Sequence, residues 1–200
     1  MMKVIRAWIA VAFLLVLSGC QSSLMTKATH PTQPSAQEST VVFLRPSSFG
    51  GAIQSSVYDV TDGKTVFGGI VSSKTQVSMQ LPAGDHLLMV IAENADFMNA
   101  TLEPGKTYYV LVMPRIGVWK ARFSLIPIHN DATAKYNIQS KQFADWKRDS
   151  QPVGKTPQAD AWYLTNQADI EAKRVDYMKK WDVMDAAHKA ELTLHAQDGI

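Results

Sequence analysis

Hydrophobic and polar residues alternate with a period of two through the middle of the chain, from Thr40 to residue 129. Residues 75–81 and 118–125 show this alternation most clearly. It is typical of a β-strand with one buried and one exposed face. In the second stretch, Phe123 is expected to point into a core and Lys120 to point towards solvent.

Short apolar runs and weaker alternating segments extend the strand pattern. The runs lie at residues 41–44, 87–91 and 108–113. Their flanking turn residues indicate strands covered on both faces, although periodicity alone does not distinguish such a run from a buried helix. The weaker strand patterns lie at residues 55–60, 65–71 and 98–102.

Turn-forming residues separate these segments. Asp62-Gly63, Pro82-Ala83-Gly84-Asp85 and Pro104-Gly105-Lys106 combine the fixed φ of proline with the permissive φ of glycine. Short strands at this spacing predict an antiparallel β-sandwich of seven or eight strands over residues 40–129. The predicted fold class is therefore mainly β, followed by a helical C-terminal extension over residues 130–200.

The C-terminal extension carries the spacing of helices. Tyr136, Ile138, Phe143 and Trp146 are spaced as in a short amphipathic helix. Thr156-Pro157 is typical of an N-cap followed by proline at the first helical position. No glycine or proline occurs in residues 158–197. This segment therefore predicts one helix of about forty residues, on the order of 60 Å long.

One face of this predicted helix is rich in large apolar side chains, among them Tyr177, Trp181 and Met184. Leaving such a face in water is costly, because burying each large side chain is worth about 1.5–3 kcal/mol. The helix is therefore expected either to fold back on the sandwich or to present these three residues as a partner surface. The full stripe comprises Tyr163, Ile170, Tyr177, Trp181, Met184, His188, Leu192 and His195.

The N-terminus has the features of a secreted lipoprotein precursor. Lys3 and Arg6 precede an apolar run at residues 7–17, which is too short to span a bilayer comfortably. Leu17-Ser18-Gly19-Cys20 then resembles the lipobox cut by lipoprotein signal peptidase. We therefore expect residues 1–19 to be a signal peptide and Cys20 to be lipidated. An ordinary signal peptide and an N-terminal transmembrane anchor are the alternatives.

The residues after Cys20 predict a tether and a location. Residues 20–39 are mostly Ser, Thr, Pro, Gln and Ala, with only Leu24 and Met25 as larger apolar residues. This composition predicts a flexible tether that places the folded part on the order of 25 Å from the lipid. Gln21 is not the aspartate of the enteric inner-membrane retention signal. We therefore expect a lipid-anchored protein of the bacterial cell envelope, at the outer rather than the inner membrane.

Charge and cysteine content exclude several classes of protein. Removal of residues 1–19 takes Lys3 and Arg6 with it and leaves 18 basic residues against 18 acidic ones. This balance gives no support for nucleic-acid binding. Cys20 is the only cysteine, so neither an internal disulfide nor a cysteine-based metal site can form. We expect no cofactor and no metal.

Several motifs together resemble the DUF2846-type bacterial lipoprotein domain, which is related in pattern to PEGA-like surface modules. They are Arg45-Pro46, Asp62-Gly63-Lys64, Leu81-Pro82-Ala83-Gly84-Asp85-His86 and Pro104-Gly105-Lys106-Thr107-Tyr108-Tyr109-Val110. The resemblance covers residues 40–128. It implies a small envelope β-sandwich with no catalytic residues to carry over.

Two histidine-containing segments are the candidates for chemistry. Asp85-His86 and His129-Asn130-Asp131 place acid, imidazole and amide close together in sequence, as a hydrolytic or metal site requires. No nucleophile motif accompanies either segment, so each is interpreted as a turn or loop and no catalytic residue is assigned. His188 and His195 lie seven residues apart without a ligand at i+4, and are interpreted as stripe residues.

Arginine and lysine residues near the strands have two interpretations. Arg115, Lys120 and Arg122 can meet an anionic glycan or lipid headgroup, but charges on an exposed strand also guard a sheet edge against aggregation. Arg45 ends an apolar run and is expected to reach a carboxylate across the sandwich or to extend to water.

Three functional classes follow. The first is a non-catalytic envelope lipoprotein that displays a β-sandwich for binding or scaffolding. The second is an accessory subunit of an envelope assembly that docks through its helical tail. The third, an envelope hydrolase, requires a pocket that gathers His86 or His129 with carboxylates. The expected partners are the membrane, through the lipid on Cys20, and an envelope protein or glycan; the sequence leaves the oligomeric state open.

Overall fold

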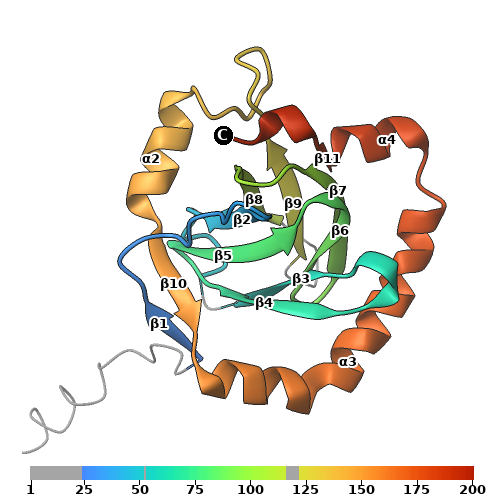
Figure 1. The fold of residues 1–200 in the computed structure, drawn as a ribbon. Coiled ribbons are helices and arrows are strands. Elements are labelled where there is room, and N and C mark those ends of the chain that lie inside the picture. Colours follow the sequence, from blue (N-terminus) through green and yellow to red (C-terminus); the bar gives the residue numbers. More distant parts are fainter. Residues whose placement is uncertain (1–23, 52, 116–121) are drawn as a thin grey trace, which may run out of the picture.

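The computed structural model describes residues 24–51, 53–115 and 122–200. Cys20 and Lys120 lie outside the described residues, as does Trp119. Two β-sheets pack face to face, with helices along their outer sides (Figure 1). Among the described residues, no helix is long and apolar enough to cross a membrane.

All eight predicted strand regions carry a strand. They are β2 (Glu38–Arg45), β3 (Ser55–Asp59), β4 (Val66–Val71), β5 (Thr75–Pro82), β6 (Gly84–Ile91), β7 (Ala95–Leu102), β8 (Thr107–Arg115) and β9 (Arg122–Ile128). Three short strands from outside residues 40–129 join them: β1 (Met25–Lys27), β10 (Gln151–Lys155) and β11 (Thr193–Leu194). The described part of the chain therefore has eleven strands rather than seven or eight.

The sheets are mixed, which corrects the prediction of a purely antiparallel sandwich. The six-stranded sheet has the order β1-β10-β5-β2-β8-β9, and the five-stranded sheet has the order β11-β7-β6-β3-β4. β2 pairs in parallel with β8, β10 with β5, and β11 with β7. Five strands separate β2 from β8 in the sequence: β5 belongs to the same sheet, and β3, β4, β6 and β7 belong to the other sheet. This long connection allows β8 to run parallel to β2. The hairpins formed by consecutive strands remain antiparallel.

Apolar residues fill the space between the sheets and also cover both outer faces. On β2, Val41 and Phe43 lie in the core between the sheets, whereas Val42 and Leu44 lie in a cluster on the outside. The helix α2 (Lys141–Asp149) covers this outer cluster with Phe143. The prediction that the run 41–44 is covered on both faces is therefore confirmed.

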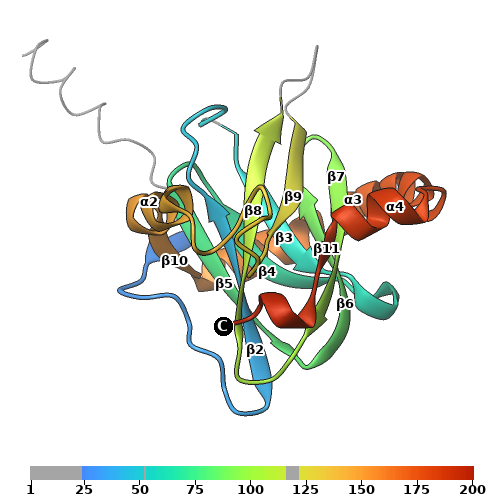
Figure 2. The same ribbon diagram turned by 90° about the horizontal axis from the view of Figure 1, so that it is seen from above.

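A second outer cluster covers the five-stranded sheet. Tyr58, Phe67 and Phe97 belong to it, and the helix α3 (Pro157–Asp182) packs against it with Ile170 and Trp181. Figure 2 shows α2 on one side of the molecule and α3 on the opposite side. The sandwich thus lies between two helices supplied by the C-terminal extension.

The extension is not one forty-residue helix. α3 starts at Pro157 as predicted but ends at Asp182, and α4 (Ala186–Glu191) starts anew after Asp185, whose carboxylate accepts a hydrogen bond from the His188 nitrogen. Aspartate favours the N-cap position, so it starts a new helix where the pattern predicted continuation. β11 then enters the five-stranded sheet with Leu194 fully buried, and a 3₁₀ turn (Ala196–Asp198) follows.

The segment expected to be a flexible tether, residues 20–39, is part of the fold from Leu24 onward. β1 pairs with β10, and Leu24 and Met25 pack against the outer cluster on the five-stranded sheet. These two are the larger apolar residues that the sequence places in this segment. Their burial offsets the cost of ordering a chain that is otherwise polar.

Candidate functional site

His86 forms a buried pair with Asp59 rather than with its sequence neighbour Asp85. Its Nδ1 lies 3.0 Å from the Asp59 carboxylate, and its Nε2 lies 3.0 Å from the Pro82 carbonyl oxygen. Asp85 instead accepts a hydrogen bond from the Thr101 hydroxyl. Successive residues of a strand point to opposite faces, which separates Asp85 from His86.

The surroundings of His86 favour the imidazolium form. The hydrogen bond to Asp59 raises the pKa of His86 above its ordinary value, against the effect of burial. Burial alone would raise the pKa of Asp59, but hydrogen bonds from His86 and Thr61 outweigh it and lower that pKa. With an acceptor at each ring nitrogen, His86 has no ring atom directed at a substrate. The pair ties β3 to β6.

His129 forms a second pair, with Asp198 near the C-terminus. Its Nδ1 lies 2.9 Å from the Asp198 carboxylate, which also accepts hydrogen bonds from the backbone nitrogens of Asn130 and His195. Asp131 accepts from Thr133 instead and does not join the pair. The hydrogen bond to Asp198 raises the pKa of His129, although burial lowers it.

These contacts fasten the C-terminus to the sandwich. Ile200 and Thr107 exchange backbone hydrogen bonds of 3.1 and 2.7 Å, and the Tyr108 hydroxyl donates to Ala196. The His195 ring stacks on His129, whereas His188 pairs with Asp185 at the start of α4. Within the described ranges, no group of three His, Cys, Asp or Glu residues is placed to hold a metal ion.

Arg45 reaches neither a carboxylate nor water, which corrects both sequence-based expectations. It is fully buried, and its guanidinium donates to the carbonyl oxygens of Ile53, Gly50 and Val71. The guanidinium also lies 4.4 Å from the centre of the Phe123 ring. Burial lowers the pKa of Arg45 to about 10. Arg45 therefore holds Gly50, Ile53 and the end of β4 together.

Arg115 and Arg122, two of the three basic residues considered as an anion-binding surface, lie on different strands. Arg122 is exposed on β9, the edge strand of the six-stranded sheet, and Arg115 lies 3.8 Å from the Asp96 carboxylate. The position of Arg122 matches the edge-guarding interpretation, whereas Arg115 ends β8, an inner strand. Lys120 lies outside the described residues.

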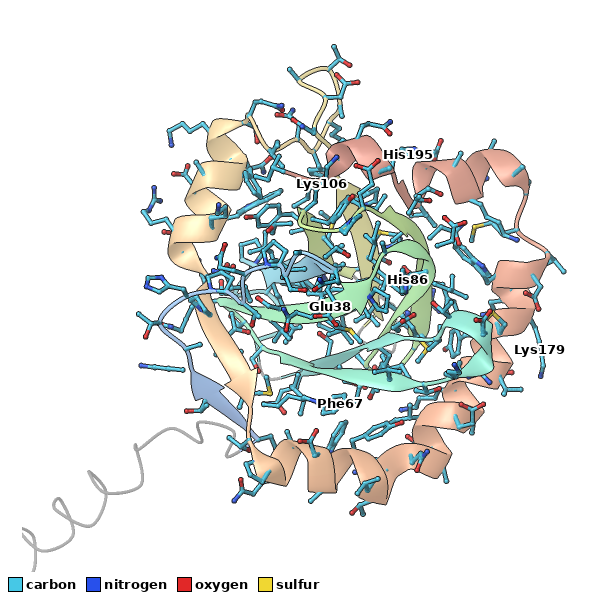
Figure 3. All side chains as sticks on the ribbon, in the orientation of Figure 1. Glu38, Phe67, His86, Lys106, Lys179 and His195 are labelled. Atoms are coloured by element: carbon cyan, nitrogen blue, oxygen red, sulfur yellow. The ribbon has the colours of Figure 1, made fainter. Side chains whose placement is uncertain are left out.

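The three residues predicted as a possible partner surface lie against the chain's own sheet. Trp181 is 7% exposed, with its ring 6.0 Å from that of Phe97. Tyr177 and Met184 are partly buried against the same cluster. Most of this aromatic face is therefore used for intramolecular packing, and the charged side of α3, with Lys179, points away from the sandwich (Figure 3).

A cavity of about 290 Å³ lies between α3 and the five-stranded sheet. Ser56, buried on β3 on the same face as Tyr58, contributes a hydroxyl to its lining, and Trp162 and Ile170 contribute apolar surface from α3. The Ser56 hydroxyl donates to the Ile91 carbonyl and accepts from the Tyr58 hydroxyl at 2.8 Å. This wall therefore combines a hydroxyl group with apolar and aromatic surface.

Polar side chains of α3 border the same cavity. Lys173 donates to the Ala92 carbonyl oxygen at 3.2 Å and pairs with Asp169 at 3.2 Å. The Asn166 amide donates to the Trp162 carbonyl, which leaves its oxygen as an acceptor. These residues repeat every three or four positions, so they share one side of the helix. That spacing is the signal in the sequence that could have identified the cavity.

Polar groups of several kinds border the cavity, and both candidate histidines lie elsewhere. Hydroxyl, amide, carboxylate and ammonium groups border it, but neither His86 nor His129 lines it. The envelope hydrolase required a pocket that holds one of these histidines beside carboxylates. The cavity is small, and its hydrogen-bonding groups lie beside the indole of Trp162.

Comparison with known proteins adds no family: the chain matches no protein-family model and no curated protein sequence.

Proposed function

We propose that this protein is a non-catalytic lipoprotein of the bacterial cell envelope, anchored through Cys20, whose β-sandwich binds a short saccharide of an envelope glycan. The cavity between α3 and the five-stranded sheet is the proposed binding site. The outer membrane is the proposed location, because Gln21 follows the lipidated cysteine. The DUF2846-type resemblance, over residues 40–128, agrees with an envelope β-sandwich.

The observation that carries the binding proposal is the composition of the cavity wall. A saccharide presents hydroxyls on its edges and C–H groups on its ring faces. Asn166 and Asp169 offer matching hydrogen-bonding groups, and Trp162 offers an aromatic surface. A volume of about 290 Å³ suits one sugar ring, with the rest of the glycan outside.

The two locked histidine pairs support the non-catalytic part of the proposal. Both nitrogens of His86 already face acceptors, and His129 is engaged by Asp198 in the C-terminal attachment. A general base must present a nitrogen within hydrogen-bond reach of the substrate proton. In these pairs the imidazoles hold together parts of the fold: His86 joins β6 to β3, and His129 joins the end of β9 to the C-terminal segment.

The test is titration of the full-length protein, in detergent, with a soluble peptidoglycan disaccharide, followed by calorimetry or NMR. Asn166→Ala and Asp169→Ala should each weaken binding about tenfold, which corresponds to about 1.4 kcal/mol. Gln167→Ala, on the same helix but outside this cavity, is the matched control and should leave affinity unchanged. An absence of binding by the folded wild-type protein, or an equal loss in the control, contradicts the proposal.

A further inference from the structure

The fold begins only four residues after Cys20. The Leu24 carbonyl oxygen accepts hydrogen bonds from the backbone nitrogen and the hydroxyl of Thr156, at 3.1 and 3.0 Å. Because an extended chain spans at most about 3.3–3.6 Å per residue, Leu24 cannot lie more than about 14 Å from Cys20. If Cys20 carries lipid, as in the proposed function on which this inference rests, the surface around Leu24 lies close to the bilayer.

α3 starts directly beside this fixed point. Thr156 is its N-cap, and Pro157 is its first residue. At a rise of 1.5 Å per residue, Leu164 lies about 10 Å along the helix from Pro157. The first two turns of α3 therefore lie close enough to Leu24 that the short link from Cys20 to Leu24 keeps them near Cys20.

The charge of α3 changes sharply along its length. Residues 157–168 contain one charged residue, Asp160, whereas residues 169–182 contain eight. Asp160 pairs with Lys155 at 3.0 Å. The solvated side of a surface helix is usually charged, as the second half of α3 is. Its first half departs from this rule.

The exposed part of that first half forms a neutral face, defined by Ala161, Leu164, Thr165 and Ala168. Leu164 is 67% exposed at its centre. A single exposed leucine needs no special explanation. Here the exposure of Leu164 coincides with two other observations. Residues 157–168 carry only one charged side chain, and the start of α3 contacts Leu24, four residues after Cys20.

We propose that the neutral face of α3 rests on the bilayer that holds the lipid on Cys20, with Leu164 at the level of the headgroups. The charged half of α3 then points away from the membrane, and the short link fixes the orientation of the whole domain. The alternative contact is the edge of the six-stranded sheet, where β1 exposes Thr26 and Lys27.

The test uses single-cysteine variants of the full-length lipidated protein, in which Cys20 is acylated and the new thiol is the only free one. Leu164→Cys and Val175→Cys are labelled with an environment-sensitive fluorophore and reconstituted in vesicles of phosphatidylethanolamine and phosphatidylglycerol. Val175, 49% exposed, is the matched control, because it lies on the same flank about 16 Å further along the helix. A lipid that carries a nitroxide near its headgroup serves as the quencher.

The label at position 164 should be quenched several-fold more than the label at 175, and this difference should disappear when Cys20 is changed to Ala. Equal quenching at 164 and 175 overturns the proposal that the neutral face contacts the membrane. Strong quenching of a label at Thr26→Cys, with none at 164, also overturns it. Neither result bears on the lipid anchor. Flotation with the vesicles separates this from failure of the proposed function. A wild-type protein that does not float has no lipid anchor, and both proposals then fall.

Discussion

The carbonyl oxygen of Leu24 accepts two hydrogen bonds from Thr156, although the two residues are 132 positions apart. This contact joins the start of the described chain to the start of α3. It places the N-terminal segment, the strand β10 and the helix in one corner of the molecule. The chain therefore joins the fold from Leu24 onward, earlier than the composition of residues 20–39 predicts.

Removing the Thr156 hydroxyl should destabilise this corner. Thr156→Val keeps the shape and the backbone donor but loses one hydrogen bond, which is worth about 0.5–1.5 kcal/mol. Denaturant unfolding measures the loss. Thr165→Val is the control, because that exposed hydroxyl bonds only within α3. Equal stability of Thr156→Val and the wild type would show that the hydroxyl contributes nothing to fastening the segment.

Truncating Phe123 should be costly. The side chain is 1% exposed in the inter-sheet core and lies beneath the Arg45 guanidinium. Phe123→Ala should reduce the free energy of unfolding by about 3–5 kcal/mol. Arg122→Ala, exposed on the same strand, should change it by less than about 0.5 kcal/mol. A larger loss for Arg122→Ala would show that the strand faces the other way.

The tail should contribute to the stability of the domain rather than to assembly. Trp181→Ala removes a buried ring that packs against Phe97, and should cost about 3–5 kcal/mol. Lys179→Ala, on the solvated side, is the control. Thermal unfolding measures both, and sedimentation measures the oligomeric state. An unchanged melting midpoint together with the loss of an oligomer would favour the accessory-subunit function instead.

The His86–Asp59 pair should make stability depend on pH. Because the folded-state pKa of His86 is raised, its contribution is fully present below the unfolded value of about 6.5 and is lost as the pH rises through the folded value. Asp59 has a lowered pKa, so its contribution is present above about pH 4 and is lost as the pH falls through its folded value.

The stability difference between the wild type and His86→Gln should therefore be largest at about pH 5–6 and should shrink as the pH rises through the raised pKa of His86. Denaturant melts across this range measure it. His188→Gln, at an exposed pair, is the control and should show a much smaller dependence. A difference for His86→Gln that grows with rising pH would contradict the charged pairing.

Local patterns predicted the strands because the period of two is itself local. The run from Val41 to Leu44 also indicated that both faces are covered, and Thr156-Pro157 marked the start of α3. The pairing of the strands could not be predicted from local patterns, because the parallel contact of β2 with β8 depends on the path of the chain between them. For the same reason the sequence placed His86 with Asp85, its neighbour along the chain, rather than with Asp59 on the adjacent strand.

The cavity was missed for a related reason. Ser56 lies in a weak strand, and Trp162, Asn166 and Asp169 lie more than a hundred residues away on a helix. Only the packing of α3 on the five-stranded sheet brings them together. The end of α3 was missed because the capping preference of Asp185 outweighed a continuous helical pattern.

Lipidation of Cys20 is measured directly by the mass of the mature N-terminus, isolated from membranes of cells that express the full chain. We expect a first residue of Cys20 that carries a diacylglyceryl group, and complete loss of this species in Cys20→Ala. An N-terminal peptide that begins at any other residue, or an unmodified Cys20, would contradict the lipid anchor and the membrane orientation derived from it.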